Sequence, residues 1–121
     1  MAVTDVSVNL ADDYTSADPT NWFKITDAPA DASFRIQVLS DNAFDGNTVA
    51  VELRDSDGVD GATTITLESG VTALGASSAE AYILSLADGD QIRLNPSAGG
   101  GSMSLNIALV PLCRATVTEQ V

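Results

Sequence analysis

The sequence predicts an all-β protein, an eight-stranded antiparallel β-sandwich of jelly-roll or Greek-key type. Apolar and polar residues alternate with a period of two in several short segments, which is typical of strands that bury one face. Asp-Gly and Ser-Gly pairs separate these segments, and such pairs readily take the positive φ that tight turns need. The 13 Asp, against 4 Glu and one Lys, also favour turns over helices.

The first half of the chain contains four of the expected strands. Residues 2–10 alternate apolar positions with polar ones, and 21–26 form a short aromatic strand between two prolines. Residues 32–38 and 49–54 both place an apolar residue at every second position. This spacing puts one face of each strand toward a core and the other toward solvent.

The second half contains the other four strands. Residues 63–68, 91–95 and 103–109 alternate, whereas 81–86 is more continuously apolar. The turn pair in residues 86–91 predicts a hairpin between two of these strands. No repeat of fixed period is visible, so a solenoid or propeller is not expected.

Length and composition predict one domain over residues 1–121. About 100–200 residues make one domain, and a chain with 45% hydrophobic residues has enough apolar surface for a core. Residues 76–81 form the one segment whose composition suits a helical turn. We expect neither a secretory signal at the N-terminus nor a membrane span, because there is no basic start and no 18-residue apolar run.

Charge and missing residue types exclude several functions. The formal net charge is −12, with 5 Lys and Arg against 17 Asp and Glu, so neither nucleic acid nor an anionic membrane is an expected partner. The absence of His removes the Ser-His-Asp triad and His-ligated zinc. A single cysteine, Cys113, allows no intrachain disulfide, and we expect it to be a small buried hydrophobe in a protein made in a reducing cytosol. We expect no catalytic residue and no cofactor.

One acidic loop is a weak metal candidate. Asp55, Asp57 and Asp60 lie in a Gly-containing segment, and spaced oxygen ligands are what Ca²⁺ requires. The pattern departs from an EF-hand loop, because no bidentate Glu follows at the required distance. The alternative is a solvated Asp-Gly hairpin, which we favour.

Aromatic residues allow two interpretations. Trp22, Phe23 and Tyr14 would suit a stacking platform for a sugar if all three were exposed. The alternative places one of the adjacent pair Trp22 and Phe23 in the core, while the other covers an edge or a subunit contact. We favour the second interpretation.

Several residues are candidates for subunit contacts. The arginines at 35, 54 and 93 occupy polar positions of three separate strands, so they should project from the outer sheet faces. They would form cross-strand pairs or contact an adjacent subunit, and Arg is enriched at interfaces. The apolar terminal segments 2–10 and 111–121 are also expected in contacts. The full set of interface candidates is Val3, Val6, Trp22, Arg35, Arg54, Arg93, Leu112 and Val117.

The segment 81–94, read as a hairpin, the Gly-rich stretch 97–102 and the strand 103–109 carry a resemblance. In these features the chain resembles the small all-β structural proteins of tailed bacteriophages, particularly capsid decoration (cement) proteins. The resemblance extends over most of the chain. It implies a homo-oligomer, often a trimer, on the outer surface of a head shell, with no catalytic residues.

The expected function is therefore that of a non-enzymatic virion structural protein. It would be made in the host cytoplasm and would stabilise a phage head by contacts with a major capsid protein or another virion protein. Two alternatives remain open: a tail or neck component, and a carbohydrate-binding or adhesin module with or without calcium.

Overall fold

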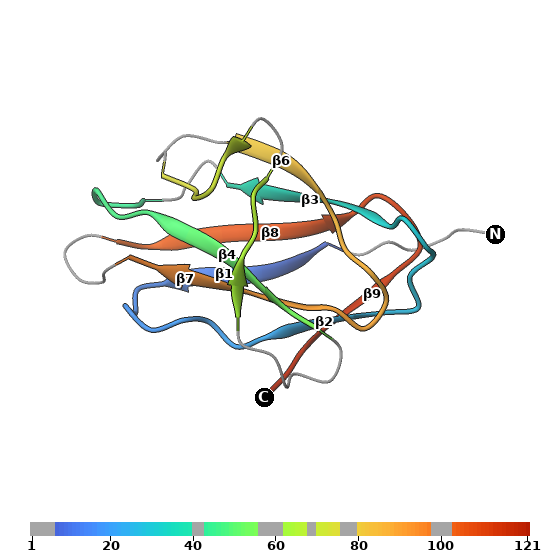
Figure 1. Ribbon diagram of the computed structural model, residues 1–121. Helices are drawn as coiled ribbons and strands as arrows, with labels where there is room; N and C mark the ends of the chain where they lie inside the picture. The colour runs from blue at the N-terminus through green and yellow to red at the C-terminus, as the bar shows by residue number, and fades with distance from the viewer. Residues whose placement is uncertain (1–6, 40–42, 56–61, 68–69, 76–79, 98–102) are drawn as a thin grey trace.

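In the part of the chain that the structure describes, nine strands form two antiparallel sheets that pack as a sandwich (Figure 1). The computed structural model describes residues 7–39, 43–55, 62–67, 70–75, 80–97 and 103–121. The strands, in chain order, are β1 (Val8–Tyr14), β2 (Phe23–Thr26), β3 (Ser33–Val38), β4 (Val49–Arg54), β5 (Thr63–Thr64), β6 (Glu80–Ser85), β7 (Gln91–Pro96), β8 (Leu105–Pro111) and β9 (Thr116–Glu119).

The strand order is that of a jelly roll. One sheet has the order β1-β8-β3-β6 and the other β5-β4-β7-β2-β9. Most connections therefore cross from one sheet to the other, and the first eight strands make the two four-stranded sheets of a jelly roll. This confirms the expected sandwich, with one strand more than the eight expected.

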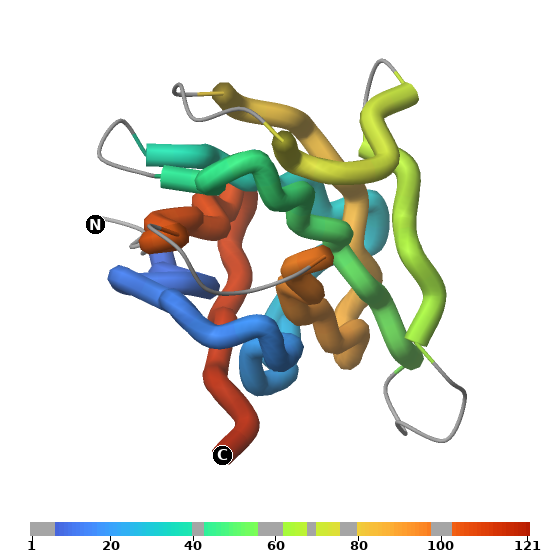
Figure 2. Tube along the Cα trace, turned by 90° about the vertical axis from the view of Figure 1, so that its left-hand side faces the viewer, coloured from blue at the N-terminus to red at the C-terminus, as the bar shows by residue number. Residues whose placement is uncertain are grey.

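The additional strand is β9, in a segment that the sequence marked only as an apolar contact region. It pairs with β2 through four consecutive residue pairs, from Phe23↔Glu119 to Thr26↔Thr116. Figure 2 shows the C-terminal segment, in red, descending beside the blue trace of β2. The C-terminal end of the described chain is thus part of the larger sheet.

The core is one layer of apolar side chains between the two sheets. Alternation along β3 buries Phe34, Ile36 and Val38 completely, while the residues between them remain partly exposed. Ile36 lies opposite Leu109 of β8, which is also fully buried. Each such side chain contributes roughly 1.5–3 kcal/mol by leaving water.

β1 continues to Tyr14, beyond the predicted end at residue 10, and this places two acids inside a strand. Residues 2–6 of the predicted segment lie outside the described residues. The register of β1 with β8 shifts twice between Asn9 and Tyr14. The irregularities let neighbouring residues share one face: Leu10 and Ala11 are both buried, whereas Asp12 and Asp13 are both exposed. Bulges of this kind break the period of two on which the prediction depended.

The hairpin predicted at residues 86–91 is wrong. The turn itself is present, because Asp90 N donates to Ala87 O at 3.0 Å and Gly89 has a φ of 91°. However, β6 pairs with β3 and β7 pairs with β4 and β2, so the turn joins strands of different sheets. Turn residues specify a local reversal, not the strand that becomes the neighbour.

Three other segments, at 63–68, 76–81 and 97–102, can be compared with the structure only in part. The strand expected at 63–68 is reduced to the two residues of β5. Most of the helical turn expected at 76–81 and of the Gly-rich stretch at 97–102 lies outside the described residues. Within the described ranges, no helix has the length and apolar character to span a membrane.

Two neighbouring residues of β8 test this register. Leu109→Ala should lower the free energy of unfolding by about 2–5 kcal/mol, because it leaves a cavity between the sheets. Val110→Ala removes a half-buried side chain from the outer face and should cost less than about 1 kcal/mol. Urea denaturation of both variants measures the difference, and a larger loss at Val110 would contradict the register.

Candidate functional site

A tryptophan that directly precedes β2 and two arginines, one from β4 and one from β7, meet on the outer face of the five-stranded sheet. Phe23 lies opposite Ile92, so the preceding Trp22 stands opposite Arg93. Since Phe23 points into the core, Trp22 points outward. The guanidinium carbon of Arg93 lies 4.5 Å from the Trp22 ring centroid, and that of Arg54 lies 4.3 Å from it. Both distances are within cation–π range.

Polar contacts hold the two arginines in place. Arg93 Nε donates to Glu52 Oε1 at 2.8 Å, and the two side chains form an ion pair. Glu52 lies directly opposite Arg93 in the β4–β7 pairing, and its second oxygen accepts from Asn95 Nδ2 at 3.0 Å. Glu52 thus fixes the position of Arg93 from the neighbouring strand.

Arg54 is held by an amide instead of a carboxylate. Its Nε and Nη2 both donate to Gln91 Oε1, at 3.3 and 2.8 Å. Gln91 faces outward yet is only 6% exposed. A residue on an uncovered sheet face is shielded in this way only when its neighbours form a closed layer above it. We call Trp22, Glu52, Gln91, Arg54 and Arg93 the stacked cluster.

The backbone around Trp22 is fixed on both sides. Thr20 N donates to Leu94 O at 2.9 Å, and Thr20 Oγ1 accepts from Leu94 N at 3.0 Å. On the other side, Gln120 N donates to Trp22 O at 2.8 Å. Trp22 is therefore tied to both β7 and the extension of β9, which limits the motion of its side chain.

The remaining interface candidates lie apart from the stacked cluster. Arg35 is on β3 of the other sheet, opposite Ile83 and Val110, and its Nε is buried with no hydrogen-bond partner among the described residues. Leu112 is 47% exposed in the connection between β8 and β9. Val117, on β9, packs against the core. Val3 and Val6 lie outside the described residues.

The three aromatic residues considered for a sugar platform do not share a surface. Phe23 is buried, and Trp22 lies under two guanidinium groups. Tyr14 is in β1, where its hydroxyl donates to Asp18 O at 2.5 Å. This arrangement matches the interpretation in which one of Trp22 and Phe23 belongs to the core.

The proposed calcium loop falls largely outside the described chain. Asp55 directly follows β4 and is partly buried, whereas Asp57 and Asp60 lie in the undescribed segment 56–61. Among the described residues, no group of three or more acidic or cysteine side chains is placed to hold a metal. Cys113 is half-buried, with its Sγ 3.6 Å from Ser33 O.

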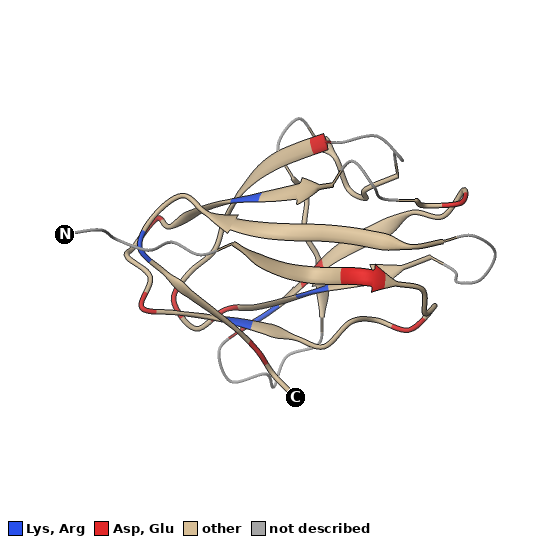
Figure 3. Ribbon diagram, turned by 180° about the vertical axis from the view of Figure 1, so that it is seen from behind, with Lys and Arg blue, Asp and Glu red and all other residues tan. Residues whose placement is uncertain are grey.

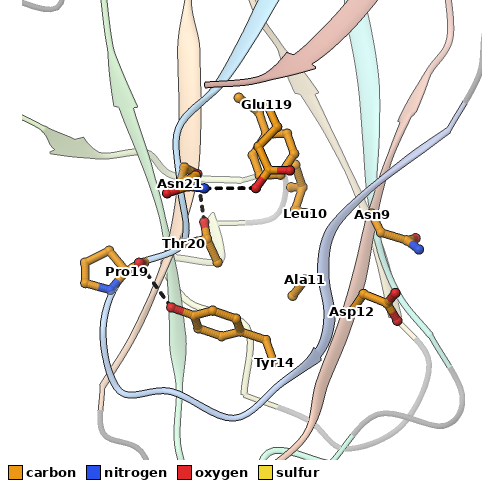
Figure 4. Close-up of a pocket in the computed structure, with 10 residues that line it drawn as sticks. Asn9, Leu10, Ala11, Asp12, Tyr14, Pro19, Thr20, Asn21 and Glu119 are labelled. Carbon is orange, nitrogen blue, oxygen red and sulfur yellow. Dashed lines mark hydrogen bonds between the residues drawn. The ribbon is translucent and has the colours of Figure 1, made fainter. Parts of the chain in front are cut away.

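A cavity of about 310 Å³ lies between β1, the segment leading to β2, and β9 (Figure 4). Leu10 and Phe23 contribute buried apolar surface to its lining, and Tyr14 closes one side with its hydroxyl turned toward Pro19 O. Asn21 Nδ2 donates to Glu119 Oε2 at 3.0 Å across the lining. These polar groups are thus already paired with one another.

No family model, curated protein or solved structure matches the chain. The class of protein that the geometry defines is a jelly-roll sandwich with a preformed cationic and aromatic cluster on one outer face.

Because Trp22 is the only tryptophan, its fluorescence reports on the cluster. Arg54→Gln and Arg93→Gln should each change the emission maximum or intensity and lower the free energy of unfolding by about 0.5–1 kcal/mol, the value of a partly exposed cation–π contact. Arg114→Gln, which removes the same charge from the exposed β8–β9 connection, should leave the emission unchanged. Equal spectra for all three variants would contradict the stacking.

Proposed function

We propose that the chain is a non-enzymatic structural protein of a tailed-phage virion, most specifically a capsid decoration protein. It would be a homo-oligomer, with a trimer favoured, on the outer surface of the head, where it stabilises the shell by contacts between subunits. The observation that supports this proposal is the stacked cluster. Tryptophan and arginine are the residue types that dominate binding energy at protein interfaces.

Preorganisation makes the cluster suited to adhesion. Its side chains are already ordered by the ion pair with Glu52, the hydrogen bonds to Gln91 and the packing over Trp22. Binding a partner therefore costs less side-chain entropy than ordering free arginines would. The hydrogen-bonded strands β4, β7 and β2 beneath the stacked cluster keep this surface rigid.

The carbohydrate alternative receives less support from the same contacts. A sugar would need an open aromatic face for stacking, and the guanidinium groups of Arg54 and Arg93 already pack on the Trp22 ring. The calcium-dependent form of that alternative depends on Asp57 and Asp60, outside the described residues. If the protein did bind a carbohydrate, the cavity beside β9 would be the binding site.

Add-back to heads tests the proposal. Purified protein is mixed with phage head shells that lack it, and the shells are sedimented and assayed for bound protein and for resistance to heat. Wild-type protein should bind saturably and raise the disruption temperature of the shell. Trp22→Ala should weaken binding by about 30-fold or more, the loss expected for an interface anchor of about 2 kcal/mol.

Arg114→Gln is the control for that experiment, since Arg114 is exposed and outside the stacked cluster. It should bind like the wild type. Wild-type protein that neither binds shells nor changes their stability would refute the decoration role, whereas binding that is indifferent to Trp22→Ala would refute the role of the cluster.

A further inference from the structure

We infer that the stacked cluster binds carboxylates, and that the acidic loop end of a second copy of this chain supplies them. This inference rests on the proposed structural role and assigns a partner to its surface. It begins with the hydrogen-bond donors of the two arginines, each of which has five N–H groups.

The remaining donors of the two arginines have no hydrogen-bond partner in the described part of the chain. Arg93 uses Nε for Glu52, and Arg54 uses Nε and Nη2 for Gln91. Both Nη groups of Arg93 and Nη1 of Arg54 are therefore left to acceptors from elsewhere. A carboxylate is the acceptor that fits a guanidinium fork best, since it takes two parallel N–H bonds.

Charge on this face is opposite to that of the chain as a whole. The register places four charged residues on the outer face of the five-stranded sheet: Lys24, Arg54 and Arg93, with Glu52 as the one acid. The sum is +2, three cations less one anion, on a chain of formal net charge −12. Glu52 thus neutralises only part of the charge, and a partner surface must be acidic to complement the rest.

The chain itself carries such a surface at one end of the sandwich. Asp12 and Asp13 are in β1 near its end at Tyr14, Asp18 lies between β1 and β2, and Asp45 lies between β3 and β4. The ends of β1 and β3 both lie beside the start of β8, so these acids share one end of the sandwich. Figure 3 shows acidic but no basic residues in the described part of that end. Two contacts fix part of it: Asp13 N donates to Asn106 Oδ1 at 2.9 Å, and Ala43 pairs with Ser104 next to the Asp45 turn.

The two complementary surfaces lie on different parts of one chain, so the contact between copies is heterologous. Heterologous contacts close into rings when the rotation permits. A ring of three copies joined from sheet face to acidic end agrees with the proposed trimer. Such a contact has carboxylates opposite the free guanidinium N–H groups and leaves the outer face of the other sheet uncovered.

Mass measurement by sedimentation or light scattering tests this contact on the full chain. Wild-type protein should associate in 50 mM NaCl, and Arg54→Gln/Arg93→Gln should raise the dissociation constant at least tenfold. Arg114→Gln removes one positive charge, as each of the two cluster substitutions does, but it lies outside the stacked cluster. It should therefore associate as the wild type does. Circular dichroism checks that each variant is folded.

Charge-reversal variants of the two surfaces distinguish a direct contact between them from a general effect of the protein's total charge on association. Arg93→Glu and Asp12→Lys/Asp13→Lys should each be monomeric alone, and an equimolar mixture should associate again, because each variant then complements the other. A monomeric wild type, or a mixture that stays monomeric, would overturn the inference. Since shells are absent from this assay, its failure would remove the homo-oligomer from the proposed function and leave shell binding standing, whereas failed shell binding would leave the self-contact standing.

Discussion

The structure depends on the packing of β8 between β1 and β3. Six of the seven residues of β8 are buried. Its inward side chains fill the core, and of its outward ones Ala108 is small and Asn106 is hydrogen-bonded to β1. Ile107 and Leu109 face the other sheet, while Asn106 on the opposite side accepts a hydrogen bond from the backbone of Asp13. This strand holds the four-stranded sheet in register, and the inner faces of both sheets then pack as one layer at close-packed density.

The stacked cluster is a consequence of that packing on the far side of the sandwich. Because Phe23 and Ile92 are drawn into the core, the alternation of the strands turns Trp22 and Arg93 outward together. The same constraint sets Glu52 opposite Arg93 and Gln91 opposite Arg54. One strand register therefore determines both the core and the surface cluster. A shift of one residue in β7 would turn its buried side chains outward and its cluster residues inward, and so disrupt both.

Sequence reasoning identified the architecture and some strands well. The bounds of β4 agree with the prediction because Val49, Val51 and Leu53 alternate without interruption. It failed where the period of two breaks, as in bulged β1, and where a strand has a single inward apolar residue, as β9 has in Val117. The Asp88-Gly89 pair also predicts a hairpin, whereas the strands on either side of it lie in different sheets, because local turn chemistry carries no information about which strands become neighbours.

The same limit applied to the site. The sequence predicts that Trp22, Arg54 and Arg93 are outward-facing or contact residues, yet nothing in the spacing of positions 22, 54 and 93 indicates that they meet. Their contact arises from the order β4-β7-β2, in which a strand late in the chain lies between two earlier ones. Long-range strand order of this kind is decided by the fold as a whole.

The uneven placement of charge on the sandwich has a consequence for motion in solution. Acids at both ends of the sandwich and cations on one sheet face distribute the charge unevenly, so the molecule has an electric dipole as well as a net negative charge. Within about 8–10 Å, the screening distance at moderate salt, a nearby anionic surface exerts a torque on that dipole. The protein therefore turns its cationic face forward before it touches such a surface, so that a larger fraction of its collisions begin in a productive orientation.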